Sequence, residues 1–290
     1  MQKINIALFI LLTPALLAAQ NITPYKVSDH NKFSWLNIEK KVPQAVITRF
    51  IADEKGEFPA YRNRSGYGYT IKELPARLHF IDINNDGAND VIFEGAGGGE
   101  GNVVEIFLST KPSYKKVFED KEGVSNIIFE NNKLKELIIS DWGCCEDYLN
   151  FDKTFSVSFS APGSLTFTLV SQTASVFQGI SPDTLFEKSF AFEILNDDYN
   201  LRSRPAVDDS SYEPWGESSS AGRVGNVVAV LYAGTKGIAI GKQTDNTGRG
   251  WWYIELDENV ALKKSVFYEN ENKFSTKKRG WISSRFVKIL

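Results

Sequence analysis

The sequence predicts a mainly β protein, with an α+β N-terminal domain that has an antiparallel sheet and one short helix, and a smaller β-rich C-terminal domain. Short apolar runs recur with turn residues between them, and residues 151–159 and 165–170 alternate apolar and polar side chains, as half-buried strands do. Aromatic residues, which favour strands, make up 13% of the chain. A Ser/Thr/Gln-rich stretch at 171–189 separates the predicted domains, which span 20–175 and 190–290.

The first residues have the layout of a secretory signal peptide. Lys3 makes the start positive, residues 4–17 are almost wholly apolar, and Ala18 and Ala19 are small residues suited to cleavage. Neither this run nor any later one reaches the roughly 18 apolar residues that a membrane helix needs. We therefore expect residues 1–19 to be removed and the mature chain to be exported, to the periplasm, the medium or the cell surface, without a membrane span.

The charge of the chain argues against one class of partner. The formal net charge is −3 at pH 7, whereas proteins that bind nucleic acid normally present a basic face. Nucleic acid is therefore not expected among the partners.

A helix is predicted after Pro43. Proline fits the first turn of a helix, where its missing N–H costs nothing. The apolar side chains that follow recur at helical spacing and form one stripe: Val46, Ile47, Phe50 and Ile51. The charged residues 53–56 end this helix, and beyond Tyr61 the pattern changes to that of strands.

Residues 82–90 read D-I-N-N-D-G-A-N-D and form the most informative motif of the N-terminal domain. Oxygen-bearing side chains recur along it, at Asp82, Asn84, Asp86 and Asp90. Gly87 stands where the backbone must turn sharply, and the first six positions match the calcium pattern D-x-[DN]-x-[DN]-G. The alternative is an Asx-rich turn that binds nothing, because Asn, Asp and Gly favour tight turns unaided.

The flanks of this loop distinguish two kinds of calcium site. A helix–loop–helix hand needs Glu at the twelfth loop position, which is Phe93 here, and the apolar runs at 78–81 and 91–93 are typical of strands. The strand–loop–strand motif resembles the blade loops of integrin-type propellers, the FG-GAP and VCBS repeat family, over residues 78–101. No second copy follows, so a single structural site is expected and not a propeller. The resemblance implies that Ca²⁺ is held by the side chains of Asp82, Asn84, Asp86 and Asp90 and by the carbonyl of Ala88.

A glycine-rich segment at 95–101 comes next. It lacks the G-K-[ST] of a phosphate-binding loop, and it leads into the strand-like residues 103–108, not into a helix whose N-terminus would hold phosphate. We therefore interpret it as a loop between strands. Further strands are predicted at 127–129 and 134–140, with a turn at residues 131–132 between them.

The chain has two cysteines, Cys144 and Cys145, and they are adjacent. A disulfide normally joins Cα atoms about 4.4–6.8 Å apart, so a bond between neighbours requires a distorted peptide. Three arrangements remain open in an oxidising compartment: a vicinal disulfide that rigidifies a turn, an intermolecular bridge, or two buried thiols. The C-x-x-C spacing of thiol oxidoreductases is absent, which argues against redox catalysis.

The C-terminal domain carries four motifs in a fixed order. Residues 199–205 read Y-N-L-R-S-R-P, 224–228 read V-G-N-V-V, 250–256 read G-W-W-Y-I-E-L and 280–287 read G-W-I-S-S-R-F-V. Together they resemble the bacterial SH3-like (SH3b) domain, over residues 190–290. The resemblance implies a small SH3-like β-barrel with an aromatic core and the second motif as its second strand. It also suggests peptidoglycan or a cell-envelope protein as the ligand.

The candidate ligand-binding residues are aromatic: Tyr199, Trp215, Trp251, Trp252, Tyr253 and Trp281. Trp251 and Trp252 would point to opposite faces of one strand, so one of them is expected outside the barrel core, free to stack on a sugar ring or to grip a peptide. The alternative is a Trp that covers a neighbouring loop. Enlarged segments at 207–222 and 257–279 depart from the family pattern. The second segment is basic, so it could bind an acidic polymer, and the alternative is a charged loop exposed to solvent.

An enzyme is not expected. The sequence has two histidines, His30 and His79, and lacks the G-x-S-x-G and H-E-x-x-H motifs. We therefore expect an exported, non-catalytic binding protein, in which a calcium-stiffened β-rich domain is joined to an SH3-like module that recognises cell-wall glycan or an envelope protein. The alternative is a periplasmic inhibitor or immunity-type protein whose large loops block a partner enzyme.

Overall fold

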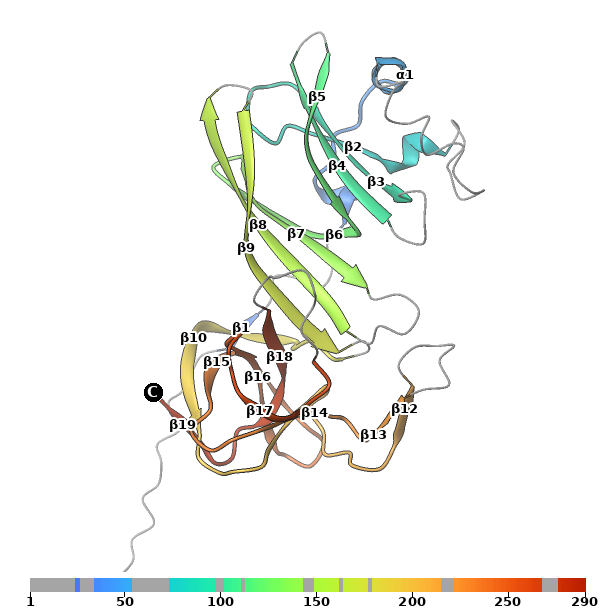
Figure 1. The fold of residues 1–290 in the computed structure, drawn as a ribbon. Coiled ribbons are helices and arrows are strands. Elements are labelled where there is room, and N and C mark those ends of the chain that lie inside the picture. Colours follow the sequence, from blue (N-terminus) through green and yellow to red (C-terminus); the bar gives the residue numbers. More distant parts are fainter. Residues whose placement is uncertain are drawn as a thin grey trace, which may run out of the picture.

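The computed structural model describes residues 24–26, 34–53, 73–96, 102–110, 113–142, 149–161, 164–176, 179–214, 222–267 and 276–290. Over these residues the protein is mainly β with one short α-helix, which confirms the predicted fold class. The described strands form a four-stranded sheet, a two-stranded sheet and one large sheet of 13 strands. Figure 1 shows two parts, with the sheets of the N-terminal half above and a curled set of C-terminal strands below.

The four-stranded sheet is an antiparallel meander in the order β2-β3-β4-β5. Its strands are β2 (Leu78–Ile81), β3 (Asp90–Ala96), β4 (Asn102–Ser109) and β5 (Tyr114–Lys121). The hairpin of β2 and β3 encloses the predicted calcium loop. The strand β5 is not among the predicted strands, because charged residues hide its apolar pattern. It lies at the edge of its sheet, where such side chains remain partly exposed.

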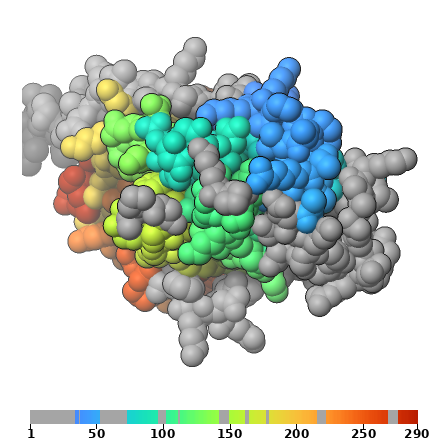
Figure 2. Space-filling model, turned by 90° about the horizontal axis from the view of Figure 1, so that it is seen from above, coloured from blue at the N-terminus to red at the C-terminus, as the bar shows by residue number. Residues whose placement is uncertain are grey.

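The helix α1 (Gln44–Asp53) packs against one face of this sheet, as its apolar stripe predicts. Phe50 is fully buried there, and its ring meets three others edge to face, which stabilises the contact beyond area burial alone. The centroid distances are 6.3, 5.3 and 4.8 Å, to Phe80, Phe107 and Tyr114. In Figure 2 the blue segment that includes α1 lies against the cyan and green strands. Two 3-10 helices precede α1 and β2, at Trp35–Asn37 and Leu74–Arg77.

The other face of the four-stranded sheet packs against a second antiparallel meander, β6-β7-β8-β9. Its strands are β6 (Gly123–Glu130), β7 (Lys133–Trp142), β8 (Leu149–Ala161) and β9 (Ser164–Val176). The predicted turn between β6 and β7 is present, and Asn131 and Asn132 both have positive φ, 52° and 61°, as a two-residue hairpin turn requires. The core between the sheets is mostly aliphatic: Ile81, Ile83, Ile92, Val104, Ile106, Leu108, Val124, Ile127, Leu134, Leu137, Ile139 and Phe155.

The C-terminal strands curl into a small open barrel in the order β19-β10-β15-β16-β18-β11-β14-β17. They are β10 (Thr184–Ile194), β11 (Tyr199–Arg202), β14 (Val227–Leu231), β15 (Lys236–Thr244), β16 (Gly250–Leu256), β17 (Leu262–Ser265), β18 (Lys277–Ser283) and β19 (Val287–Ile289). The strand β1 (Pro24–Lys26) pairs with the beginning of β10. The separate two-stranded sheet consists of β12 (Tyr212–Pro214) and β13 (Gly222–Val224).

The predicted strand at 224–228 is interrupted. β13 ends at Val224 and β14 begins at Val227, with a turn between them. Gly225 has φ +74°, and a Cβ at this residue would lie 2.7 Å from the carbonyl oxygen of Asp208. The chain turns here because glycine alone fits both this backbone conformation and this close approach.

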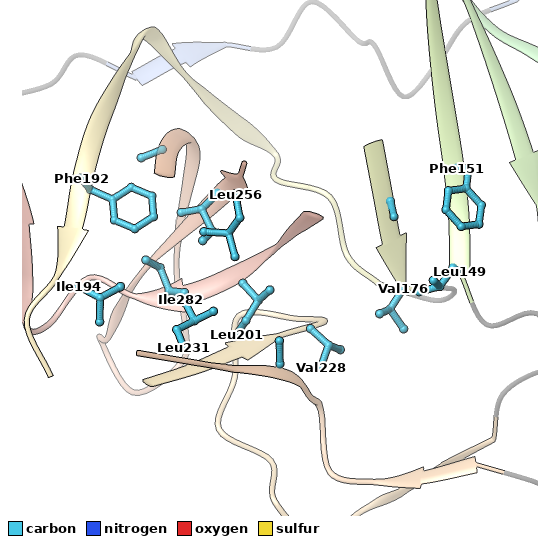
Figure 3. Close-up of a cluster of buried hydrophobic side chains, with 14 of the residues drawn as sticks. Leu149, Phe151, Val176, Phe192, Ile194, Leu201, Val228, Leu231, Leu256 and Ile282 are labelled. Atoms are coloured by element: carbon cyan, nitrogen blue, oxygen red, sulfur yellow. The ribbon is translucent and has the colours of Figure 1, made fainter. Parts of the chain in front are cut away.

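The two parts of the molecule share one sheet and one apolar cluster. β18 pairs with β9 in parallel, and the paired residues of β18 are Lys277 and Lys278. The ends of β8 and β9 then contribute side chains to the cluster that forms the barrel core (Figure 3), among them Leu149, Phe151 and Val176. The stretch 171–189, predicted to separate the domains, therefore contains the end of β9 and the beginning of β10.

A polar cluster lies at the same junction. Glu255 on β16 pairs with Lys277 at 2.8 Å and with Arg279 at 2.9 Å, both on β18. Arg279 also lies 3.9 Å from Asp152 on β8, and Asp152 accepts a hydrogen bond from Ser140 on β7. Charged and polar side chains thus connect the second meander to the barrel.

Gly280→Ala is expected to lower the free energy of unfolding by about 1–3 kcal/mol, the usual cost of overpacking. A Cβ at this position of β18 would lie 2.9 Å from the carbonyl oxygen of Arg202 and 3.0 Å from the Leu201 side chain, so β11 and β18 would have to separate. Denaturant unfolding measures the change. Lys288→Ala, at an exposed position on β19, is the control and should leave stability unchanged. Unchanged stability of Gly280→Ala would contradict this close packing.

Candidate functional site

A pocket of about 260 Å³ opens on the barrel, where β11 begins, where β15 turns into β16, and where β18 turns into β19. Its walls include three arginines and three aromatic residues: Arg202, Arg249, Arg285, Tyr199, Trp251 and Phe286. Tyr199 and Trp251 are among the predicted ligand-binding residues. The other four are not, because only the fold brings these segments together.

Arg202 lines the pocket and already makes structural hydrogen bonds. It is buried, and its guanidinium donates to Asp209 at 2.8 Å, to the side chain of Asn226 at 2.7 Å and to the carbonyl of Asp208. A buried cation needs such partners, since an unpaired one would be very costly. Arg202 therefore holds the surrounding loop in place.

The other two arginines lack acidic partners. Within the described ranges, no carboxylate lies at ion-pair distance from Arg249 or Arg285. One acidic residue, Asp198, also lines the pocket, but Lys263 pairs with it at 2.9 Å. The pocket therefore carries an excess of positive charge on Arg249 and Arg285.

Arg249 lies against the ring of Trp251. Its guanidinium carbon is 5.7 Å from the ring centroid, within the range of a cation–π contact. The Nε–H of Arg249 is buried and has no hydrogen-bond partner in the described part of the chain. An unsatisfied buried donor costs about 1–3 kcal/mol, so a ligand that accepts this hydrogen bond would recover that energy.

The turn between β15 and β16 fixes the backbone of Arg249 and the side chain of Trp251. The carboxylate of Asp245 accepts hydrogen bonds from the backbone N–H groups of Thr247 and Arg249 and, at 2.8 Å, from the indole Nε1 of Trp251. The Thr247 hydroxyl, followed by the Trp251 indole, holds the pKa of Asp245 well below its usual range. Asp245 therefore stays ionised and keeps the Trp251 ring oriented.

Tyr199 closes the pocket on the β11 side. Its hydroxyl donates to the carbonyl oxygen of Ser283 at 2.7 Å and also lies against that of Arg285. Burial raises the pKa of Tyr199, although the cations of Arg249 and Arg285 oppose this shift. The phenol therefore stays neutral and holds the turn between β18 and β19.

Phe286 forms an apolar rim at the same turn. It is 59% exposed, and its φ of +58° is one that a bulky residue rarely adopts. The turn is held on its other side by the N–H of Leu195, which donates to the Phe286 carbonyl. Backbone strain of this kind is frequent at ligand sites, which supports a binding role for this corner of the barrel.

Trp251 shares a second cluster with Tyr253 and Trp281, and all three are buried. The linker segment 179–183 covers this face of the barrel, and the Trp281 indole donates to the carbonyl of Ile180. Burial raises the pKa of Tyr253 to about 12, so its phenol stays neutral. Tyr253 and Trp281 therefore anchor the linker and do not present their rings to solvent.

Trp252 lies on the opposite face of β16, partly buried against the rings of Phe190 and Phe192 at 5.1 and 6.4 Å. Trp251 thus lies outside the barrel core, as expected for one of the two tryptophans, but its ring is buried and not free, which fits the alternative of a Trp that covers a neighbouring loop. The reason is that both faces of β16 are covered, one by the barrel core and the other by the linker. Three further predicted residues lie outside the described ranges: Trp215, Cys144 and Cys145.

The loop at 82–90 is held by hydrogen bonds to its own backbone. The N–H of Asp86 donates to Asp82 and to Asn84 at 3.1 and 3.0 Å, and Asp86 in turn accepts from the N–H of Ala88 at 2.7 Å. The side-chain oxygens of Asn84 and Asp86 each accept the backbone N–H two residues further along the chain. These are the Asx turns of the alternative interpretation. The predicted ligands thus gather at one turn.

The carboxylate of Asp90 is fully buried and makes a different set of hydrogen bonds. Its two oxygens accept the N–H groups of Ile83 and Ser109 at 3.0 and 2.8 Å. Burial raises the pKa of Asp90 to about 7, against the effect of these bonds. Across the described ranges, no three Asp, Glu, His or Cys side chains are arranged to hold a metal ion. The donor set thus fits a hydrogen-bonded turn, and calcium binding stays a prediction.

The chain matches no protein-family model, no curated protein and no solved structure. The resemblances to SH3-like domains and to propeller calcium loops therefore stay predictions. No helix in the described ranges is long and apolar enough to cross a membrane. What the described structure provides is a β-rich protein with a cationic, aromatic-walled pocket.

The predicted calcium site in the 82–90 loop can be tested directly. If the ion binds, calcium should raise the melting temperature of the protein relative to chelator, because a ligand of the folded state stabilises it. Asp86→Ala should abolish that difference, whereas Asp183→Ala, at an exposed site in the linker, should retain it. Thermal unfolding with and without chelator gives the measurement. Equal melting temperatures in both conditions for the parent chain would show that the loop is a turn alone.

Proposed function

We propose that the protein is an exported, non-catalytic binding protein whose C-terminal barrel holds a negatively charged group of its ligand in the arginine-lined pocket. The ligand would be peptidoglycan or a protein of the cell envelope, as the SH3-like motifs suggest. Export rests on the signal-peptide pattern of residues 1–19. A calcium ion in the 82–90 loop would be structural, and ligand binding would not depend on it.

The guanidinium groups of Arg249 and Arg285, which have no acidic partner among the described residues, carry this proposal. A cation on the wall of a small pocket loses part of its hydration, and an anionic ligand would restore both charge pairing and directional hydrogen bonds. The buried Nε–H of Arg249 adds one donor that no described residue satisfies. An anionic group in the pocket would therefore meet two guanidinium groups that have no acidic partner among the described residues.

The net charge of the chain narrows the class of ligand. At −3 overall, the protein has no general positive field, so the positive charge of the pocket is local. A local site of this kind suits a single anionic group, whereas a nucleic acid would need an extended basic surface. Acidic groups on a cell-wall polymer or on a protein surface meet this requirement.

Binding to purified sacculi tests the proposal. The parent chain should be retained, and Arg249→Gln and Arg285→Gln should each reduce the bound fraction about ten-fold, the effect expected when one hydrogen bond to a charged group is lost. Lys288→Gln removes a positive charge away from the pocket and should leave retention unchanged. Circular dichroism of each variant checks that the fold is kept.

Two preparations separate the ligand classes. Retention on protease-treated sacculi identifies the polymer, and retention on untreated sacculi alone identifies an attached envelope protein. Failure to bind either preparation, or binding that both arginine variants retain in full, would contradict the proposed function. Retention should also weaken as salt is raised, because the pocket is open to solvent.

A further inference from the structure

We infer that the pocket takes the free carboxylate at the end of a peptide chain, with a small apolar side chain beside it. This inference rests on the proposed function, since it names the chemical group that the pocket would hold. Its basis is the combination of pocket size, donor geometry, neighbouring charge and apolar rim.

The size of the pocket favours a chain end. Its volume of about 260 Å³ is below the roughly 300–1,000 Å³ of typical small-molecule sites. Arg202 and Trp251, two of the residues that line it, are buried. A pocket of this size accommodates one or two residues of a chain and not a longer stretch of polymer.

The donors favour a carboxylate. The guanidinium group presents its Nε–H and one Nη–H side by side in a plane, a spacing that matches the two oxygens of a carboxylate. Arg249 lines the pocket, and its buried Nε–H has no partner among the described residues. Arg285, on the turn between β18 and β19, supplies a second positive charge in the pocket wall.

The neighbouring charge limits how negative the ligand can be. Asp198 lines the same pocket, and although Lys263 pairs with it, its carboxylate is exposed and would repel a second negative charge. A carboxylate carries one negative charge, while a phosphate at neutral pH carries up to two. The pocket therefore favours a carboxylate over a phosphate group.

The remaining walls favour an apolar neighbour. Phe286 and Val207 are both half or more exposed, at 59% and 50%, and both line the pocket. A methyl or similar side chain next to the carboxylate would cover part of this surface and remove it from water. The chain end should therefore carry a small apolar residue.

Calorimetry on the mature chain tests the inference with three probes: N-acetyl-dialanine, the same dipeptide with a C-terminal amide, and inorganic phosphate. The free acid should bind, and the amide should bind at least about ten-fold more weakly, because it lacks the charge that the arginines pair with. Phosphate should bind more weakly than the free acid. Equal binding of acid and amide, tighter binding of phosphate, or no binding of the acid would overturn the inference.

Variants locate the binding and separate it from the proposed function. Arg249→Lys keeps the charge but loses the planar fork, so it should bind the free acid more weakly than the parent chain and discriminate less against phosphate. Lys288→Gln should behave like the parent chain. Suppose that the protein binds sacculi through Arg249 and Arg285 but does not bind the dipeptide acid. The chain-end carboxylate is then excluded, and the proposed function stands. If neither is bound, both fail.

Discussion

The parallel pairing of β9 with β18 is the contact on which the rest of the architecture depends. It is short, yet it joins the second meander and the barrel into one sheet. A parallel pair cannot be closed by a tight turn, so its second strand must return from a distance along the chain. Here β18 follows β9 in the sequence only after the strands β10 to β17. The pairs of Arg279 with Glu255 and Asp152 lie beside this contact, so backbone bonding, apolar packing and charge act together.

The same strand positions the pocket. β18 begins at the junction, at Lys277, and ends at Ser283, where the turn that carries Arg285 and Phe286 starts. A side chain at the end of a paired strand is held more precisely than one in a long loop. The hydroxyl of Tyr199 then fixes the turn against β11. The pocket is thus built where a rigid strand stops, with a hairpin of β15 and β16 as its other wall.

The sequence allowed the helix and many of the strands to be predicted because burial of one face imposes a period on apolar residues, whereas charged side chains hid the strand β5. Alternation along β16 correctly separates Trp251 from Trp252, but it cannot tell what covers each face, and the linker covers the face that seemed free. In the 82–90 loop, residue spacing predicts the turn, but not whether the carboxylates meet an ion or backbone N–H groups. Arg249 was not among the predicted ligand-binding residues, for a related reason. Nothing local distinguishes it from Arg279, which has acidic partners across the sheet.

The pairing of β1 with β10 decides how far the barrel is an independent module. Residues 24–26 lie beside the beginning of β10, so the barrel receives strands from both sides of the N-terminal sheets in the sequence. In topological terms, those sheets are one long insertion between β1 and β10, which are neighbouring strands of the barrel. A fragment that begins at Phe190 would lack β1 and the first part of β10, and it would uncover the edge of β18 that β9 occupies. Any exchange of the barrel between proteins would have to preserve two strand pairings at once, that of β1 with β10 and that of β9 with β18.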